Sequence, residues 1–153
     1  MGKMIGLQVL DGRYGISRLS GAAAVPAWAD GEGFVSITRN GDELSIVCRV
    51  ERIPAGTPSD LNWACLRFIG PFSFGETGIV LSVIKPLSEN GLGVFLVSTF
   101  DGDCLLLKSE DLSVGRKLLM AAGHTILDLG ATYADRQHEN VYGVSLCSLS
   151  GDV

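Results

Sequence analysis

LGVFLVSTFDGDCLLLK, at residues 92–108, consists of two apolar runs joined by a short polar turn. Asp101-Gly102 is a strong signal for a tight turn between antiparallel strands, because both residue types tolerate positive φ. The stretch therefore predicts strands over residues 92–100 and 104–108. The second run is apolar at consecutive positions, Cys104 to Leu107, which predicts a central strand that is buried on both faces.

Helices are predicted on either side of this hairpin. One covers residues 77–89, where apolar side chains recur at helical spacing and form one stripe: Ile79, Val80, Val83, Ile84 and Leu87. The other covers residues 110–122, with Ser109 as its N-terminal cap. With strands over residues 63–69 and 125–129, the order becomes β-α-β-β-α-β, which is the ferredoxin-like order.

The preceding residues predict a shorter unit of the same kind. Strands are expected at residues 12–19, 34–38 and 44–50, with one or two helical turns within residues 22–30. Residues 38–44 also align without a gap on residues 99–105, with identical Thr, Gly, Asp and Leu. Shared turn chemistry alone explains the Asn-Gly and Asp-Gly match, but the flanking identities favour a duplicated module.

The sequence therefore predicts an α/β chain, of the α+β type, with two ferredoxin-like βαββαβ modules. The first, abbreviated module is expected at residues 10–61 and the complete one at residues 62–129. Residues 130–153 form a C-terminal tail of unknown structure, in which residues 140–149 can make one strand.

The composition disfavours several classes of partner and location. The 153 residues are 46% hydrophobic with a net charge of −5, which suits a packed core and disfavours nucleic acid or an anionic membrane as partner. The apolar run at residues 4–10 is too short for a signal peptide or a membrane span. The cysteines form no C-x-x-C pair, so we expect buried free thiols rather than disulfides or metal ligands. These features predict a cytoplasmic protein.

Short motifs in both halves resemble one known family. They are PAW at residues 26–28, LSIVC at 44–48, WACL at 63–66, GPFSFGETGI at 70–79, PLSENG at 86–91, VSTFDGD at 97–103 and AAGH at 121–124. Together they resemble a bacterial family of tandem ACT-domain proteins, similar to the ACT modules of animal arginine sensors and of aspartate kinase regulatory regions. The resemblance covers about residues 10–128.

The resemblance implies a small-molecule site, usually for an amino acid, where two modules meet, and it implies a homodimer. The ligand would contact the loop before the first helix, here residues 74–79, where free N–H groups favour a carboxylate. Its ammonium group would need a carboxylate from the hairpin. The predicted ligand-binding residues are Glu76, Thr77, Gly78, Ile79, Ser98, Thr99, Phe100, Asp101 and Asp103. No cofactor, metal or catalytic residue is expected.

Other interpretations remain open at this point. Asp101 can satisfy its own turn instead of a ligand. The same scaffold can serve as a protein-interaction module with a degenerate pocket. An enzyme would need a nucleophile beside a base, and the histidines do not suggest one: His124 is expected to cap a helix end, and His138 lies in a polar run.

Overall fold

The computed structural model describes residues 3–70, 72 and 75–127. The regular elements are β1 (Gly6–Val9), β2 (Tyr14–Ser20), β3 (Ser36–Arg39), β4 (Glu43–Arg49), β5 (Ser59–Ile69), α1 (Ile79–Ser88), β6 (Val94–Ser98), β7 (Asp103–Lys108), α2 (Leu112–Ala121) and β8 (Thr125–Leu127). Single 3₁₀ turns lie at η1 (Ala27–Ala29), η2 (Val50–Arg52) and η3 (Ser109–Asp111). The predicted tail at residues 130–153, including the strand at 140–149, lies outside the described residues.

Both halves of the chain share one strand order, which confirms the predicted α+β fold class. In the second half the strands are ordered β6-β7-β5-β1-β8, and β5, α1, β6, β7, α2 and β8 follow each other along the chain. In the first half the order is β3-β4-β2-β5, and 3₁₀ turns stand where a complete module has helices. The ferredoxin-like order is therefore present twice, and β5 belongs to both copies.

The strand β1 was not predicted from the sequence. It lies antiparallel to β5 and parallel to β8, and so separates two strands that would otherwise be neighbours. Its Leu7 is fully buried, and Ile5 and Val9 are nearly so. The apolar run at residues 4–10 is thus an internal strand of the second module, although it precedes the first module in the sequence.

The strand β5 joins the two halves because its two ends pair differently. Its start lies beside β2, whereas its later residues lie between β1 and β7. Asn62 adopts a φ of 69°, and the pairing with β2 shifts register beside it. This β-bulge bends the strand. The boundary expected between residues 61 and 62 falls at this bend, inside β5.

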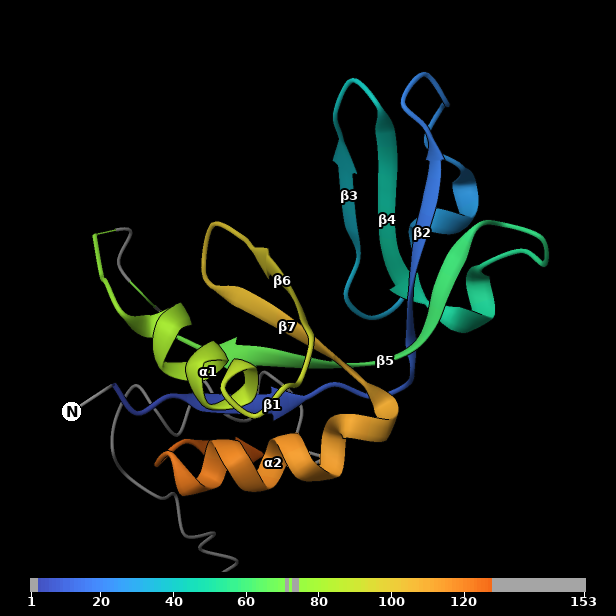
Figure 1. The fold of residues 1–153 in the computed structure, drawn as a ribbon. Helices are drawn as coiled ribbons and strands as arrows, with labels where there is room; N and C mark the ends of the chain where they lie inside the picture. The colour runs from blue at the N-terminus through green and yellow to red at the C-terminus, as the bar shows by residue number, and fades with distance from the viewer. Residues whose placement is uncertain (1–2, 71, 73–74, 128–153) are drawn as a thin grey trace, which may run out of the picture.

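Two layers make up the second half, as Figure 1 shows: both α-helices cover the same face of the sheet. Ile79, Val83 and Leu87 of α1 are buried there, while Val80 and Ile84 pack partly buried against the same core, as the helical spacing predicts. The run Cys104 to Leu107 is buried at every position, which confirms the prediction of a central strand.

The opposite face of this sheet packs against the first half. Trp63 and Cys65 of β5 share a buried cluster with Tyr14 of β2 and Val47 of β4. Cys48, Cys65 and Cys104 are buried free thiols, as expected, and Cys147 lies outside the described residues. The two halves therefore share apolar core as well as a strand.

Arginine side chains hold the first half together where a complete module has helices. Arg52 donates hydrogen bonds to the carbonyl oxygens of Trp28, Ala29 and Glu32 at 3.2, 3.5 and 2.7 Å. These contacts fix the segment around η1 over the β4 face, where Leu44, Ile46 and Cys48 are fully buried. A guanidinium can do this because it offers several N–H donors in one plane.

Two sequence-based details need correction. The last pairs of the two hairpins are Arg39↔Leu44 and Ser98↔Asp103, so structurally equivalent positions differ from the gap-free alignment by two residues. That alignment followed the shared turn chemistry. Ser109 is not the cap of α2: η3 intervenes, and the buried Ser109 hydroxyl has no hydrogen-bond partner among the described residues.

Candidate functional site

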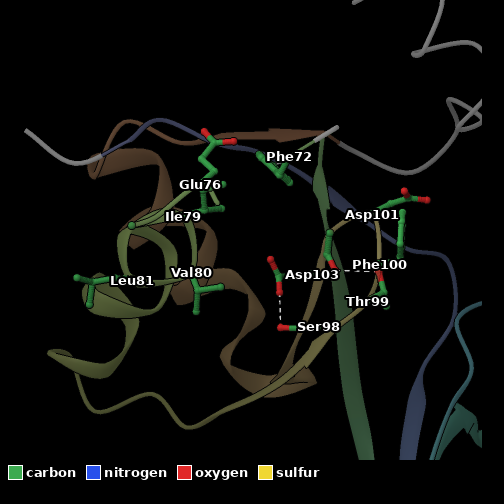
Figure 2. A pocket seen from close by; sticks show the side chains of 12 residues that line it. Phe72, Glu76, Ile79, Val80, Leu81, Ser98, Thr99, Phe100, Asp101 and Asp103 are labelled. Atoms are coloured by element: carbon green, nitrogen blue, oxygen red, sulfur yellow. Dashed lines mark hydrogen bonds between the residues drawn. The ribbon is translucent and has the colours of Figure 1, made fainter. Parts of the chain in front are cut away.

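A pocket of about 350 Å³ lies between the start of α1 and the turn that joins β6 to β7. Figure 2 shows Ile79 and Val80 on the α1 side, with Ser98 and Asp103 facing them from the hairpin and Thr99 farther along the turn. Phe72 lies above the gap between these two walls. The volume falls in the range of pockets for small molecules.

The first wall is the start of α1. Gly78 precedes the helix with φ 81° and ψ −3°, and it supplies no side-chain cap. The first N–H groups of a helix have no partner within the helix. A hydrogen-bond acceptor, and in particular a negatively charged one, is therefore favoured at this end. A Cβ built at Gly78 would meet nothing within 4 Å, so this glycine is required by its backbone conformation rather than by crowding.

The second wall is the hairpin turn. Thr99 closes it, because its backbone N–H and its hydroxyl both donate to the carbonyl oxygen of Gly102, at 2.6 and 2.8 Å. Ser98 donates a hydrogen bond to the carboxylate of Asp103. Asp101 makes no hydrogen bond to this turn within the described part of the chain. The alternative in which Asp101 satisfies its own turn is therefore not what the structure shows.

The structure brings together nearly all of the residues that the sequence singled out. Every one of them except Thr77 lines this pocket. Thr77 is exposed beside it. Asp103 points toward α1, whereas Asp101 and Phe100 point away from it at the outer side of the turn. Whether these residues bind a ligand stays a prediction.

Sequence reasoning missed four of the lining residues: Phe72, Val80, Leu81 and Gly102. Val80 was assigned to the apolar stripe of the helix, where it also packs. Leu81 is 61% exposed although it is apolar, and it lies just outside that stripe. An apolar residue off the buried face was the signal that could have identified it.

The pocket is acidic. Its lining includes the carboxylates of Glu76, Asp101 and Asp103, and none of the described lining residues is Lys, Arg or His. The ammonium group of Lys3 lies 3.0 Å from Glu76, which leaves two carboxylates at the hairpin side. The charge at this side favours a positively charged group in the ligand.

The surroundings of His124 differ from those that its sequence position predicts. His124 does not act as a charged helix cap: its Nδ1 accepts a hydrogen bond from the N–H of Ile5, so this nitrogen carries no proton. Its Nε2 lies against the carbonyl oxygen of Ser82. No group of three or more His, Cys, Asp or Glu is placed to hold a metal within the described ranges. No helix there is long and apolar enough to cross a membrane.

Two family models match the first and second halves of the chain separately. Residues 59–119 match the family model of the ACT domain, and residues 12–56 match a model described as an N-terminal domain. A curated relative, named "Cytosolic arginine sensor for mTORC1 subunit 1" from Bos taurus, is 29% identical in an alignment of 92 positions that covers 53% of this chain. The match covers only 28% of that relative's length.

Solved structures agree with this assignment. An aspartate kinase from Clostridium acetobutylicum has a TM-score of 0.59 at 12% identity, covering 80% of this chain and 35% of that one, which shows a common fold. The crystal structure of protein Atu0741 from Agobacterium tumefaciens has a TM-score of 0.81 at 57% identity, covering 86% of this chain and 98% of that one. The chain therefore contains an ACT domain at residues 59–119 and belongs, together with the Agobacterium protein, to a family of tandem ACT-domain proteins.

Proposed function

We propose that this chain is a non-catalytic regulatory protein that binds an amino acid in the pocket between α1 and the β6–β7 turn. The observation that carries the proposal is that the two sides of the pocket favour groups of opposite charge. Free N–H groups at the start of α1 suit an α-carboxylate, while Asp103 across the pocket suits an ammonium group. A free amino acid has both groups at the required ends.

The acidic lining further favours an amino acid with a cationic side chain. One carboxylate is enough for the α-ammonium group, and the hairpin side supplies both Asp101 and Asp103. An acidic side chain would add a like charge to this acidic pocket and be repelled. The cattle relative is named as an arginine sensor, which agrees with this charge argument. We therefore place arginine and lysine ahead of the neutral and acidic amino acids.

Binding would regulate by favouring one arrangement of the protein over another. A ligand shifts such an equilibrium only as far as it binds one arrangement better than the other. Its contacts to α1 and to the hairpin would draw these two walls together. We further propose that the working form is a cytoplasmic homodimer, in which a second copy covers the open side of the pocket near Phe100, which is 79% exposed.

Isothermal titration calorimetry at neutral pH tests the proposal. Saturable binding is expected for arginine or lysine, with aspartate and glutamate much weaker. Asp103→Asn should weaken binding roughly tenfold or more, because a charge-assisted hydrogen bond is lost. Asp42→Asn is the matched control, because Asp42 occupies the exposed β3–β4 turn, outside the pocket. Absence of saturable binding by all twenty amino acids would contradict the proposal.

A protein-interaction module is the second candidate. It is favoured by the exposure of two apolar residues on the pocket lining, Leu81 at 61% and Phe100 at 79%. Such residues stabilise a protein interface when a partner covers them. Under this alternative, Phe100→Ser abolishes partner binding while no amino acid binds, which separates it from ligand sensing.

A further inference from the structure

The helix α1 contains a proline, and this leaves one of its carbonyl oxygens without the usual partner. In an α-helix the N–H of each residue donates to the carbonyl oxygen four positions earlier. Pro86 has no N–H, so the carbonyl oxygen of Ser82 receives no helical hydrogen bond from it. Ser82 is partly buried, and a carbonyl oxygen left unpaired there would lower stability.

His124 supplies the missing donor. Its Nε2 lies 2.7 Å from the carbonyl oxygen of Ser82, and a carbonyl oxygen can only accept, so Nε2 must carry the hydrogen. Its Nδ1 accepts the N–H of Ile5 at 3.0 Å and must be unprotonated. The ring is 5% exposed. The two contacts together select one neutral tautomer, with the hydrogen on Nε2.

This junction is connected to the pocket on both sides. Ser82 belongs to the first turn of α1, and its N–H donates to the carbonyl oxygen of Gly78, which lines the pocket. Ile5 leads back to Lys3, whose ammonium group pairs with the pocket residue Glu76. The buried ring of His124 therefore contacts the backbone of α1, which forms one wall of the pocket. It also contacts the segment that carries Lys3, the partner of the Glu76 carboxylate.

We propose that His124 is a positioning residue, which replaces the N–H that Pro86 removes and fastens Ile5, the residue just before β1, to the first turn of α1. The α1 wall of the pocket is then held in place from a site outside the pocket. The inference concerns the ligand-free protein, so it does not depend on the identity of the ligand or on whether an amino acid binds.

Two substitutions separate the two contacts. The amide of a Gln side chain reaches the position of Nε2, and that of an Asn side chain reaches the position of Nδ1. His124→Gln is therefore expected to keep the contact to Ser82 and lose the one to Ile5, while His124→Asn does the reverse. Amide hydrogen exchange followed by NMR reads this out. The N–H of Ile5 should exchange faster in His124→Gln than in His124→Asn. The contact to Ser82 is made by its carbonyl oxygen, while its N–H donates to Gly78, so the loss of this contact in His124→Asn is measured by thermal unfolding.

Pro86→Ala provides the rescue experiment, because it returns an N–H to the carbonyl oxygen of Ser82. His124→Asn is expected to lower Tm by roughly 5 °C in the wild-type background. In the Pro86→Ala background the loss should be less than half as large, because the helix then satisfies its own carbonyl group. His124→Gln should show no such dependence on residue 86. Nitrogen NMR of the wild-type ring should place the proton on Nε2.

Three results would overturn the proposal. One is a proton found on Nδ1 of His124. Another is additive loss of Tm in the double variant, which would mean that Pro86 and His124 act independently. The third is an Ile5 N–H that exchanges equally fast in the two His124 variants. A histidine that merely fills space would give both of the last two results.

Discussion

Gly78 shows how one residue sets the start of a helix and the wall of a pocket. Its φ of 81° is in the left-handed region, and a Cβ would meet no atom within 4 Å. Gly78→Ala should therefore lower the free energy of unfolding by about 1 kcal/mol through backbone strain alone. Urea unfolding measures this.

Gly91, just after α1, is the matched control for that change. It has a φ of 78° and is equally uncrowded, but it lies outside the pocket lining. Gly91→Ala should cost the same stability and leave ligand affinity unchanged, whereas Gly78→Ala should also weaken ligand binding. Gly78→Asn should cost less than Gly78→Ala, because Asn tolerates this conformation better. Equal stability of wild type and Gly78→Ala would contradict the described helix start.

The Cys65 thiol should make stability depend on pH in the alkaline range. Its hydrogen bond with Cys104 and its burial raise its pKa. The same hydrogen bond lowers the pKa of Cys104, but burial opposes that shift, so the rise at Cys65 outweighs it. An unfolded thiol has a pKa of about 8.5, so above this pH the unfolded state loses a proton that the folded state keeps. The contribution of Cys65 is therefore fully present below about pH 8.5 and is lost as pH rises further.

Thermal unfolding of Cys65→Ala at a series of pH values tests this. Wild-type Tm should fall as pH rises from about 7.5 to about 9.5, and Cys65→Ala should fall less steeply. Val47→Ala, in the same buried cluster, removes apolar volume but no titratable group. It should lower Tm and keep the wild-type slope. Parallel slopes for wild type and Cys65→Ala would exclude the thiol as the cause.

Predictions at the residue scale succeeded where the signal was local. Burial of Cys48 and Cys104 followed from the apolar runs around them. The role of His124 did not follow, because its partners Ile5 and Ser82 lie 119 and 42 positions away along the chain. Position near a helix end suggested a charged cap, and only the tertiary contacts show a neutral ring.

Elements were predictable in proportion to their own sequence signals. Both helices and the β6–β7 hairpin carry apolar periodicity or turn residues, and the structure has them. The apolar run at residues 4–10 does not predict β1, because a short apolar run alone does not distinguish a strand from other apolar segments. The start of β5 at Ser59 was missed because Pro54, Gly56 and Pro58 indicated a connector.

The strand β1 can be tested as an internal element of the second module. Leu7 is fully buried among residues of β5, α1 and α2. Leu7→Ala should therefore lower the free energy of unfolding by about 3 kcal/mol. Met4→Ala is the control, because Met4 is 78% exposed at the end of the same segment, and its effect should stay within about 0.5 kcal/mol. Equal effects in urea unfolding would contradict the position of β1.

At the scale of the whole molecule, the fold was easier to predict than the site. Repeated strand and turn patterns gave the fold class, whereas the pocket residues came from the family resemblance, not from any pattern in their spacing. The pocket forms because β5 and β7 pair and α1 packs across them, so that Phe72, Leu81 and the hairpin turn all line one pocket. Only the packed tertiary structure places such residues together.

The shared strand β5 predicts that the two halves unfold together. Because β5 pairs with β2 at one end and with β1 and β7 at the other, neither half has a complete sheet without it, and Tyr14 and Trp63 lie in one buried cluster that joins the halves. Trp28 reports on the first half, where it packs beside Leu44 and Ile46, and Trp63 reports on the junction.

Trp63→Phe and Trp28→Phe each leave one of these reporters. In each variant, the urea midpoints from tryptophan fluorescence and from circular dichroism should coincide, as expected for two-state unfolding. A fluorescence midpoint in Trp63→Phe well below its circular dichroism midpoint would show that the first half unfolds alone, and that β5 does not couple the two halves.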